Sequence, residues 1–221
     1  MALKALLLDL DGTLIDTAPD MIASLNHVLR SHSEQEVSIK QAANYVSHGA
    51  AALLNFGFPY PLDPNHQESL VAEFLEYYRS HVSDLSVPYA GMQECLAFCE
   101  NQGIPWGVVT NKPFNLSRQL LDDLDLLSRC RILLGGDSLP VKKPDPAPLL
   151  HCCMTLSLAG SDCLYVGDHE RDITAGNAAG MDTAIAAWGY IQQTEEPNDW
   201  GANYLLRQPS GLLALLQERI S

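Results

Sequence analysis

The sequence is poor in basic residues, with 13 Lys and Arg against 27 Asp and Glu in 221 residues. The formal net charge of −14 would repel polyanions, which argues against nucleic acid or an anionic membrane surface as a partner. An anionic substrate would therefore need a local positive site in an otherwise negative protein.

A long apolar segment is also missing. The first apolar run is broken by Asp9 and Asp11, far short of a secretory leader or a membrane span. The six cysteines include no CxxC pair, and adjacent Cys152 and Cys153 suit a disulfide poorly, which favours reduced thiols. With 47% hydrophobic residues, the chain can still bury a substantial core. We therefore expect a soluble, cytoplasmic protein of one or two domains, with no membrane partner.

The stretch from Leu6 to Leu14 carries the first functional signal. Three leucines lead into Asp9, and Asp11-Gly12 turns the chain immediately afterwards. Such a run predicts a buried strand of a parallel sheet, and ligands bind at the carboxyl ends of these strands. Asp9 and Asp11 are two residues apart and share one face of the strand. Two carboxylates this close share a proton or bind a cation such as Mg²⁺, and a plain Asp-Gly turn is the alternative.

Helical spacing replaces the strand pattern between about residues 16 and 84. Helices are expected behind Thr17 and Asp20, from Ser38, from Gly49 and over Leu70–Val82. No strand signal interrupts them, and Pro and Gly in Val87–Gly91 mark the far junction. The pattern predicts a helical insertion.

Strands and helices alternate after the insertion. The expected strands are Ile104–Val109, Arg131–Leu134, Cys163–Val166 and Thr183–Ala187. Apolar stripes predict helices over 92–99, 116–127, 149–156 and 173–179, and a last helix from Ser210. This alternation predicts an α/β fold with a doubly wound parallel sheet and right-handed crossovers.

Polar residues stand near the ends of the other predicted strands. They are Thr110-Asn111-Lys112, Lys142–Pro146 and Gly167–Asp172. Taken singly, these segments have simple alternatives, namely a helix cap, an exposed lysine and an acidic helix start. Together they would lie at the same edge of the sheet as Asp9 and Asp11.

The order of these residues resembles the haloacid dehalogenase superfamily of phosphatases, whose motifs are DxDGT, a strand-end Ser or Thr, a Lys, and GDxxxD. The matching residues are Asp9–Thr13, Thr110, Lys143 and Gly167–Asp172. The resemblance covers the whole chain and implies a Rossmann-like core of residues 1–15 and 85–221 with an inserted α-helical cap of residues 16–84. It also implies that the cap closes about hinges near Asp16 and Asp84.

The resemblance further implies an Mg²⁺-dependent phosphomonoesterase. Asp9 would attack phosphorus and form an aspartyl phosphate, and Asp11 would act as general acid and then general base. The metal would be held by Asp9, the main-chain carbonyl of Asp11 and Asp168. Asp172 would complete this metal site by orienting water or Lys143.

The same resemblance assigns the residues that bind the substrate. Thr110 and the Asn111 amide would donate to the transferring group, and Lys143 would supply the positive charge. Gly12 would lie against the same group, and His48 and Gly49 of the cap could face the leaving group. A helix start with an exposed histidine is the alternative for the cap segment.

Other activities on this scaffold fit the residues less well. A dehalogenase attacks carbon and needs neither a metal nor a second acid, so Asp11 and Asp168 argue against it. A hexose-phosphate mutase such as β-phosphoglucomutase holds its substrate with basic cap residues. The predicted cap has few, chiefly Arg30, Lys40 and Arg79, which favours hydrolysis. A non-enzymatic binding protein would lack one of the acids, and none is missing.

Two segments point to different small phosphorylated metabolites. Ser47-His48-Gly49 resembles the cap loop of phosphoglycolate phosphatases, although Ser47 replaces a glycine. The loop from Trp188 to Ala202 resembles that of the N-acetylmuramic acid 6-phosphate phosphatases of cell-wall recycling. Its aromatic rings could stack on a sugar, or they could seal the loop onto the core, especially Trp200. We expect a monomer or a homodimer.

Overall fold

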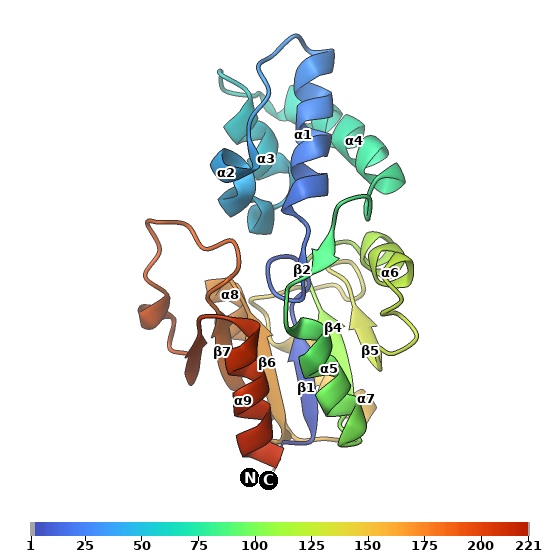
Figure 1. Ribbon diagram of the computed structural model, residues 1–221. Helices are drawn as coiled ribbons and strands as arrows, with labels where there is room; N and C mark the ends of the chain where they lie inside the picture. Colours follow the sequence, from blue (N-terminus) through green and yellow to red (C-terminus); the bar gives the residue numbers. More distant parts are fainter. Residues whose placement is uncertain (1–2, 221) are drawn as a thin grey trace.

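Six parallel strands form the central sheet of the computed structural model, which describes residues 3–220 (Figure 1). Their order is β5-β4-β1-β6-β7-β8, and every neighbouring pair runs parallel. The strands are β1 (Ala5–Leu8), β4 (Trp106–Val109), β5 (Ile132–Leu134), β6 (Cys163–Gly167), β7 (Asp182–Ala186) and β8 (Tyr204–Leu206). Each strand predicted from the sequence is present, whereas β8 was not expected.

Helices cover both faces of this sheet. They are α5 (Met92–Asn101), α6 (Phe114–Asp123), α7 (Ala147–Leu156), α8 (Glu170–Ala178) and α9 (Pro209–Ile220). On β1, Leu6 and Leu8 belong to the apolar cluster with α5, α6 and α9, whereas Ala5 and Leu7 belong to the cluster with α7 and α8. Because both faces are covered, all four residues of β1 are buried. The predicted doubly wound α/β core is confirmed.

Strand β1 lies where the strand order reverses. The chain passes from β1 to β4 and β5 on one side, and then crosses to β6, β7 and β8 on the other. In sheets of this kind the ligand crevice opens outside the carboxyl ends of the strands at such a reversal. Asp9, the residue after β1, is therefore at the crevice.

The predicted helical insertion lies above the carboxyl edge of the sheet (Figure 1). Its helices are α1 (Ala18–Ser31), α2 (Ile39–Ala42), α3 (Ala50–Gly57) and α4 (Pro64–Ser80), with a short 3-10 helix (Ala43–His48) before α3. Ser38 and Gly49 cap the starts of α2 and α3, as predicted. Helices α1, α3 and α4 pack on one another and bury Leu25, Leu53 and Phe74. The insertion therefore has an apolar centre of its own.

A two-stranded antiparallel ribbon, which the sequence did not predict, joins the insertion to the sheet. It pairs β2 (Ile15–Asp16) with β3 (Val87–Pro88). Strands of two residues are too short to show the alternation on which a strand prediction depends. The ribbon adjoins the hinge regions expected near Asp16 and Asp84. The domain boundaries after residues 15 and 84 remain a prediction.

Helix α6 ends earlier than the apolar pattern indicated. The predicted helix ran to Leu127, but α6 ends at Asp123. Asp125 has φ +56°, a left-handed conformation that a right-handed helix cannot include. Leu124 and Leu127 nevertheless pack against the core from the turn that follows. The apolar spacing therefore continued beyond the helix itself.

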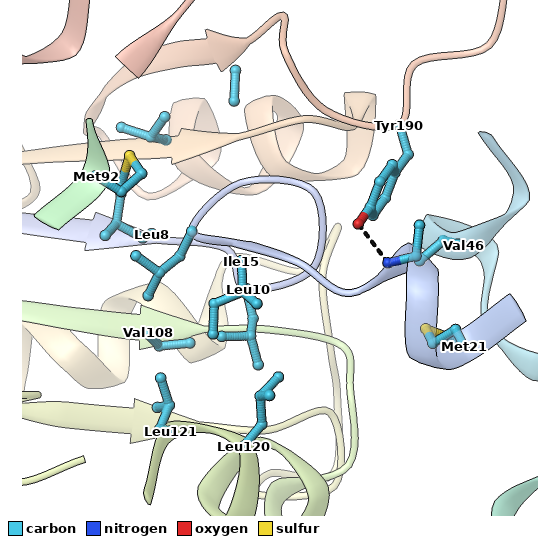
Figure 2. Packing of buried hydrophobic residues seen from close by; sticks show 14 of the residues in the cluster. Leu8, Leu10, Ile15, Met21, Val46, Met92, Val108, Leu120, Leu121 and Tyr190 are labelled. Atoms are coloured by element: carbon cyan, nitrogen blue, oxygen red, sulfur yellow. Dashed lines mark hydrogen bonds between the residues drawn. The ribbon is translucent and has the colours of Figure 1, made fainter. Parts of the chain in front are cut away.

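Tyr190, in the loop after β7, ties that loop to the start of the insertion. Its hydroxyl accepts a hydrogen bond from the Ala18 amide at 2.8 Å, drawn as a dashed line in Figure 2. The same hydroxyl donates to the Asp16 carboxylate at 2.7 Å. Burial raises the pKa of Tyr190, which keeps the hydroxyl protonated as a donor. The loop thus braces the junction that carries the insertion.

Within residues 3–220, no helix combines the length and apolar character needed to cross a membrane. All six cysteines are free thiols, as predicted, and most of them are buried. Burial raises the pKa of the Cys95 thiol to about 12, so this thiol remains protonated at neutral pH.

Candidate active site

Asp9 extends the buried ladder of β1 into the crevice. Its amide donates to the Val166 carbonyl at 2.9 Å, the next step in the pairing of β1 with β6. Its Oδ1 atom accepts from the Leu10 amide at 2.7 Å and lies 3.0 Å from Nζ of Lys143. Asp9 is only 6% exposed, yet it lines a cavity. The carboxylate is therefore fixed in place and still accessible.

The turn after Asp9 requires glycine. Gly12 has φ +79°, and a Cβ atom at this position would lie 2.2 Å from Oδ2 of Asp168. The Gly12 amide donates to the Ile15 carbonyl at 3.0 Å and closes the turn. Gly12 therefore lets the loop approach Asp168. Its predicted contact with substrate stays a prediction, because Gly12 is not among the residues that line the cavity.

Three of the acids predicted to hold a metal come together. One carboxylate oxygen each from Asp9, Asp168 and Asp172 lies within 4.8 Å of the others, and all three residues are buried. Carboxylate oxygens are the donors that Mg²⁺ prefers. The chemistry of this donor set fits a hard divalent cation.

The carboxylate of Asp11 stands apart from this cluster. Its Oδ1 atom accepts from the Thr17 hydroxyl at 2.7 Å and from the Lys112 ammonium at 2.8 Å. Asp11 nevertheless lines the same cavity as Asp9. A bond from Asp11 to a metal would therefore use its main-chain carbonyl, as the family resemblance implies, and would leave the carboxylate for proton transfer.

The acids of the cluster have different pKa values because their charges are unevenly balanced. Burial raises the pKa of Asp9, but the positive charges of Lys143 and Arg171 lower this pKa by more than burial raises it. The net shift is downward, and the carboxylate stays ionised. Burial, together with the charges of Asp9 and Asp172, raises the pKa of Asp168 to about 8. A cation would relieve this repulsion, which supports a metal site here.

Lys143 is buried, so the alternative of an exposed lysine was wrong. Lys143 is 2% exposed, and its Nζ atom lies 3.0 Å from Oδ1 of Asp9 and 2.7 Å from Oδ1 of Asp172. The ammonium also donates to the Tyr165 hydroxyl at 2.7 Å and to the Val109 carbonyl at 2.8 Å. Lys143 therefore holds two acids in position from behind the cavity wall.

Thr110 and Asn111 follow β4, the neighbour of β1, and both line the cavity. The Thr110 hydroxyl oxygen accepts from the Lys112 amide at 3.3 Å, which leaves the hydroxyl proton for a ligand. Nδ2 of Asn111 donates to the Lys143 carbonyl at 2.9 Å. Within residues 3–220, Oδ1 of Asn111 is buried without a hydrogen-bond partner.

A cavity of about 220 Å³ lies between the sheet edge and the insertion. Six predicted site residues line it together: Asp9, Asp11, Thr110, Asn111, His48 and Gly49. Much of the wall from the insertion is apolar and comprises Met21, Val46, Ala50, Phe74, Leu75 and the ring of Tyr78. Lys143, Asp168 and Asp172 are not among the lining residues and lie buried next to Asp9.

Three cations in the cavity wall were not predicted, namely Lys112, Lys142 and Arg171. Each lies inside or beside a strand-end motif, at a position that the motif leaves open. In a chain of net charge −14, basic residues next to such motifs are the signal that could have found them. The basic residues noted in the insertion, Arg30, Lys40 and Arg79, do not line the cavity.

The insertion touches the sheet directly over the acid cluster. The Ser47 hydroxyl donates to Oδ2 of Asp168 at 3.2 Å, and the Arg171 guanidinium donates to the Ser47 carbonyl. Nε2 of His48 lies 3.4 Å from Nε2 of His169, so one ring donates and the other accepts. Burial, with the charge of Arg171, lowers the pKa of His169 to about 4 and keeps that ring neutral. The insertion therefore covers the site in the manner of a closed cap.

The aromatic residues of the loop after β7 pack on the protein. Nε1 of Trp188 donates to the Thr13 carbonyl at 3.1 Å, and Trp200 stacks on His169 with ring centroids 6.4 Å apart. Neither tryptophan lines the cavity. The interpretation that these rings seal the loop onto the core agrees with this arrangement.

The comparisons with known proteins define the class. The haloacid dehalogenase-like hydrolase family matches residues 6–186, and the chain belongs to this family. A phosphoglycolate phosphatase of Xanthomonas campestris is 41% identical over 209 residues, which are 95% of this chain and 94% of that protein. An N-acetylmuramic acid 6-phosphate phosphatase of Pseudomonas aeruginosa is 40% identical over 220 residues, which are 100% and 97% of the two chains.

A solved structure agrees with this assignment. The crystal structure of a predicted phosphoglycolate phosphatase from Haemophilus somnus superimposes with a TM-score of 0.86 at 26% identity. The match covers 96% of this chain and 97% of the other. The family and enzyme class predicted from the four motifs, a phosphatase with an inserted helical cap, are confirmed.

Proposed function

We propose that the protein is an Mg²⁺-dependent phosphomonoesterase that acts on a small phosphorylated metabolite through an aspartyl phosphate on Asp9. The position of the Asp9 carboxylate carries the proposal. It lines the cavity, and it also lies beside Lys143 and forms one acid cluster with Asp168 and Asp172. A nucleophile, a cation site and a space for substrate therefore meet at one side chain.

The residues of the cavity wall account for both chemical steps. Asp9 attacks phosphorus in line, and its new bond to phosphorus forms as the bond to the alcohol oxygen breaks. Asp11 gives its proton to the departing alkoxide. In the second step Asp11 takes a proton from the attacking water, which releases inorganic phosphate and regenerates Asp9. Thr110 and Asn111 hold the phosphoryl oxygens.

Asp9, Asp168 and Asp172, with the main-chain carbonyl of Asp11, would hold the metal. Three buried carboxylates with a strongly raised pKa at Asp168 fit a divalent cation. When bound, Mg²⁺ offsets negative charge on the phosphoryl oxygens and so favours the approach of an anionic nucleophile. Lys143 keeps Asp9 ionised from the other side.

Phosphoglycolate is the substrate favoured by the cavity. Its volume of about 220 Å³ lies below the roughly 300–1,000 Å³ of typical pockets for drug-sized ligands. A cavity of this size suits a two-carbon phosphate ester better than the larger amino-sugar phosphate. A phosphoglycolate phosphatase 41% identical over nearly the whole chain supports the same choice.

N-acetylmuramic acid 6-phosphate is the second candidate. The observation that favours it is the match to the Pseudomonas aeruginosa phosphatase, which extends over 100% of this chain at 40% identity. A substrate of this size would require the insertion to stand further from the sheet than it does here. That movement would separate the contact of His48 with His169.

A phosphomutase and a non-catalytic binding protein are less well supported. None of Arg30, Lys40 and Arg79 lines the cavity, so the insertion offers no lysine or arginine for a second phosphate. A binding protein would have no use for the buried acid cluster beside Asp9. The free, mostly buried thiols support a cytoplasmic location for the phosphatase.

Release of inorganic phosphate from 2-phosphoglycolate and N-acetylmuramic acid 6-phosphate, measured side by side, tests the proposal. We expect Mg²⁺-dependent turnover that EDTA stops, with the higher kcat/KM on 2-phosphoglycolate. A preference of about tenfold, or about 1.4 kcal/mol in transition-state binding, decides between the two substrates. Hydrolysis of neither ester, or hydrolysis indifferent to EDTA, would contradict the proposal.

A further inference from the structure

The Arg171 guanidinium occupies the cavity wall without an anionic partner. It lines the cavity, and no Asp or Glu oxygen in residues 3–220 lies within 4.0 Å of its nitrogens. Four other arginines of the described chain also lack an Asp or Glu oxygen within 4.0 Å, but all four are exposed, whereas Arg171 is partly buried in the cavity wall: they are Arg79, Arg118, Arg131 and Arg207. The absent ion pair leaves its charge available to a ligand.

One nitrogen of this guanidinium is also unsatisfied. A terminal nitrogen donates to the Ser47 carbonyl, whereas Nε is buried and has no hydrogen-bond partner among the described residues. A buried donor without an acceptor is unfavourable and calls for an explanation, and a ligand that supplies the acceptor provides one. The fixed fork of donors on arginine matches the two oxygens of a carboxylate.

The bond to Ser47 places the guanidinium at the seam between sheet and insertion. In the proposed function the phosphoryl group binds at the sheet edge, next to Thr110, Asn111 and the acids that would hold the metal. The alcohol half of the substrate must extend from there toward the insertion. The lining residues that the insertion contributes to the cavity include no carboxylate that would repel an anion.

The other cations of the wall are less suited to this task. The Lys112 ammonium already donates to the Asp11 carboxylate and to the Tyr78 hydroxyl, both at 2.8 Å. Lys142 is exposed, so water screens its charge. Arg171 combines partial burial, a fixed position and an unpaired charge.

We infer that Arg171 forms a carboxylate-binding subsite, and that the enzyme selects phosphomonoesters whose alcohol half carries a carboxylate. This inference rests on the proposed function and narrows its substrate class. Glycolate and N-acetylmuramic acid, the alcohols of the two candidate substrates, both carry a carboxylate. The subsite accounts for recognition of either one by the same side chain.

Matched pairs of esters test the inference. 2-Phosphoglycolate is compared with 2-hydroxyethyl phosphate, and N-acetylmuramic acid 6-phosphate with N-acetylglucosamine 6-phosphate, because each pair differs by the carboxylate-bearing group. We expect wild type to prefer the acid in at least one pair by about 10- to 100-fold in kcat/KM, as for a hydrogen-bonded charge. Arg171→Gln should bring that ratio close to one, and Arg171→Lys should retain part of it.

The ratio within a pair separates this role from others. Arg171 also lowers the pKa of Asp9, so its loss can slow both members of a pair, but only a carboxylate subsite changes their ratio. Lys142→Gln is the matched control, and its ratio should stay near that of wild type. A wild-type ratio near one, or a ratio that survives Arg171→Gln, would overturn the inference while leaving the phosphatase assignment intact.

A second measurement needs no variant. Glycolate should compete with substrate in wild type, whereas ethylene glycol at the same concentration should not. Equal inhibition by both alcohols, or by neither, would overturn the subsite even if Arg171→Gln failed to fold. Inactivity of wild type on all four esters would instead contradict the proposed function, and the inference would fall with it.

Discussion

The Lys112 ammonium donates to the Tyr78 hydroxyl at 2.8 Å, so a residue beside β4 is bonded directly to helix α4 of the insertion. The same ammonium lies 2.8 Å from the Asp11 carboxylate. Burial lowers the pKa of Lys112, but Asp11 and Tyr78 raise this pKa by more than burial lowers it, so the net shift is upward. The general acid proposed for the reaction is thus linked through one buried cation to the insertion.

Tyr78→Phe should destabilise the protein by about 1.5–3 kcal/mol, the value of a hydrogen bond to a charged group. The change keeps the buried ring and removes only the hydroxyl that the Lys112 ammonium contacts. Urea denaturation measures the loss. Tyr45→Phe is the control, because the Tyr45 ring stacks on Phe56 at 4.4 Å and should keep its packing. Equal stability of Tyr78→Phe and wild type would show that the buried bond contributes nothing.

Asp9→Asn should reduce phosphate release to background while leaving the fold intact. An amide cannot form the acyl phosphate, but it has the shape of the carboxylate and can still accept from the Leu10 amide. Phosphate release and circular dichroism measure the two effects. Asp122→Asn, an exposed change on α6, is the control and should be fully active. Wild-type turnover by Asp9→Asn would exclude the proposed nucleophile.

Asp168→Ala should weaken Mg²⁺ binding by more than about 100-fold, because loss of outer partners alone typically costs 10–100-fold. Titration of activity with Mg²⁺ gives the apparent affinity. Thermal denaturation gives a second readout, since a ligand that binds only the folded state raises its stability as RT ln(1 + [L]/Kd). Mg²⁺ should therefore raise the midpoint of wild type and hardly that of the variant. An unchanged Mg²⁺ requirement would remove Asp168 from the metal site.

The metal-free protein should gain stability as the pH falls from about 8 to about 6.5. The pKa of Asp168 is raised from 3.8 to about 8 in the folded state, so over this range the folded state binds more protons than the unfolded state. The gain is about 1.6 kcal/mol over 1.5 pH units, because the full slope of about 1.36 kcal/mol per unit is reached only below the folded pKa. Urea denaturation in EDTA at a series of pH values measures it.

Histidine limits this effect at lower pH. Burial lowers the pKa of His169 to about 4, so between pH 6.5 and 4 the unfolded state binds a proton at this histidine first, and the resulting loss of stability offsets the continuing gain from Asp168. Asp168→Asn should abolish the gain between pH 8 and 6.5, and saturating Mg²⁺ should suppress it in wild type. A profile for Asp168→Asn identical to that of wild type would assign the pH dependence to other groups.

The core of the fold could be predicted because its central strands are apolar on both faces. Leu6, Leu7 and Leu8 are all buried, and such a run is visible without knowledge of the fold. Edge strand β8 has three partly buried residues, and the ribbon of β2 and β3 has two residues in each strand, so neither gives a clear pattern. Short edge elements depend on their neighbours more than on their own sequence.

The acids of the site could be predicted for a similar reason. Parallel strands bring their carboxyl ends to one edge, so Asp9 and Asp168 meet whatever the side chains around them do. The position of Arg171 depends instead on the carbonyl of Ser47, 124 residues away, and that of Lys112 on Tyr78 in the insertion. These contacts between the sheet and the insertion depend on the orientation of the insertion over the sheet, and no local sequence pattern encodes that orientation.

Asp20 supports the junction and gives the last prediction. It is 1% exposed, and its carboxylate accepts from the Leu85 amide at 3.0 Å and from the amide and hydroxyl of Ser86 at 2.7 and 2.6 Å. The start of α1 is thereby bonded to the chain as it leaves the insertion. Asp20→Ala leaves these buried donors without an acceptor.

We expect Asp20→Ala to cost about 2–5 kcal/mol in urea denaturation, because two backbone donors and a hydroxyl lose a charged acceptor. Ser86→Ala removes only one donor and should cost about 1.5–3 kcal/mol or less. None of these residues lines the cavity, so the change should leave the chemical step largely intact. A loosened junction would let the insertion stand open over the site, and we therefore expect KM to rise more than kcat falls. A stable Asp20→Ala protein with wild-type kinetics would show that the ribbon of β2 and β3 holds the junction without Asp20.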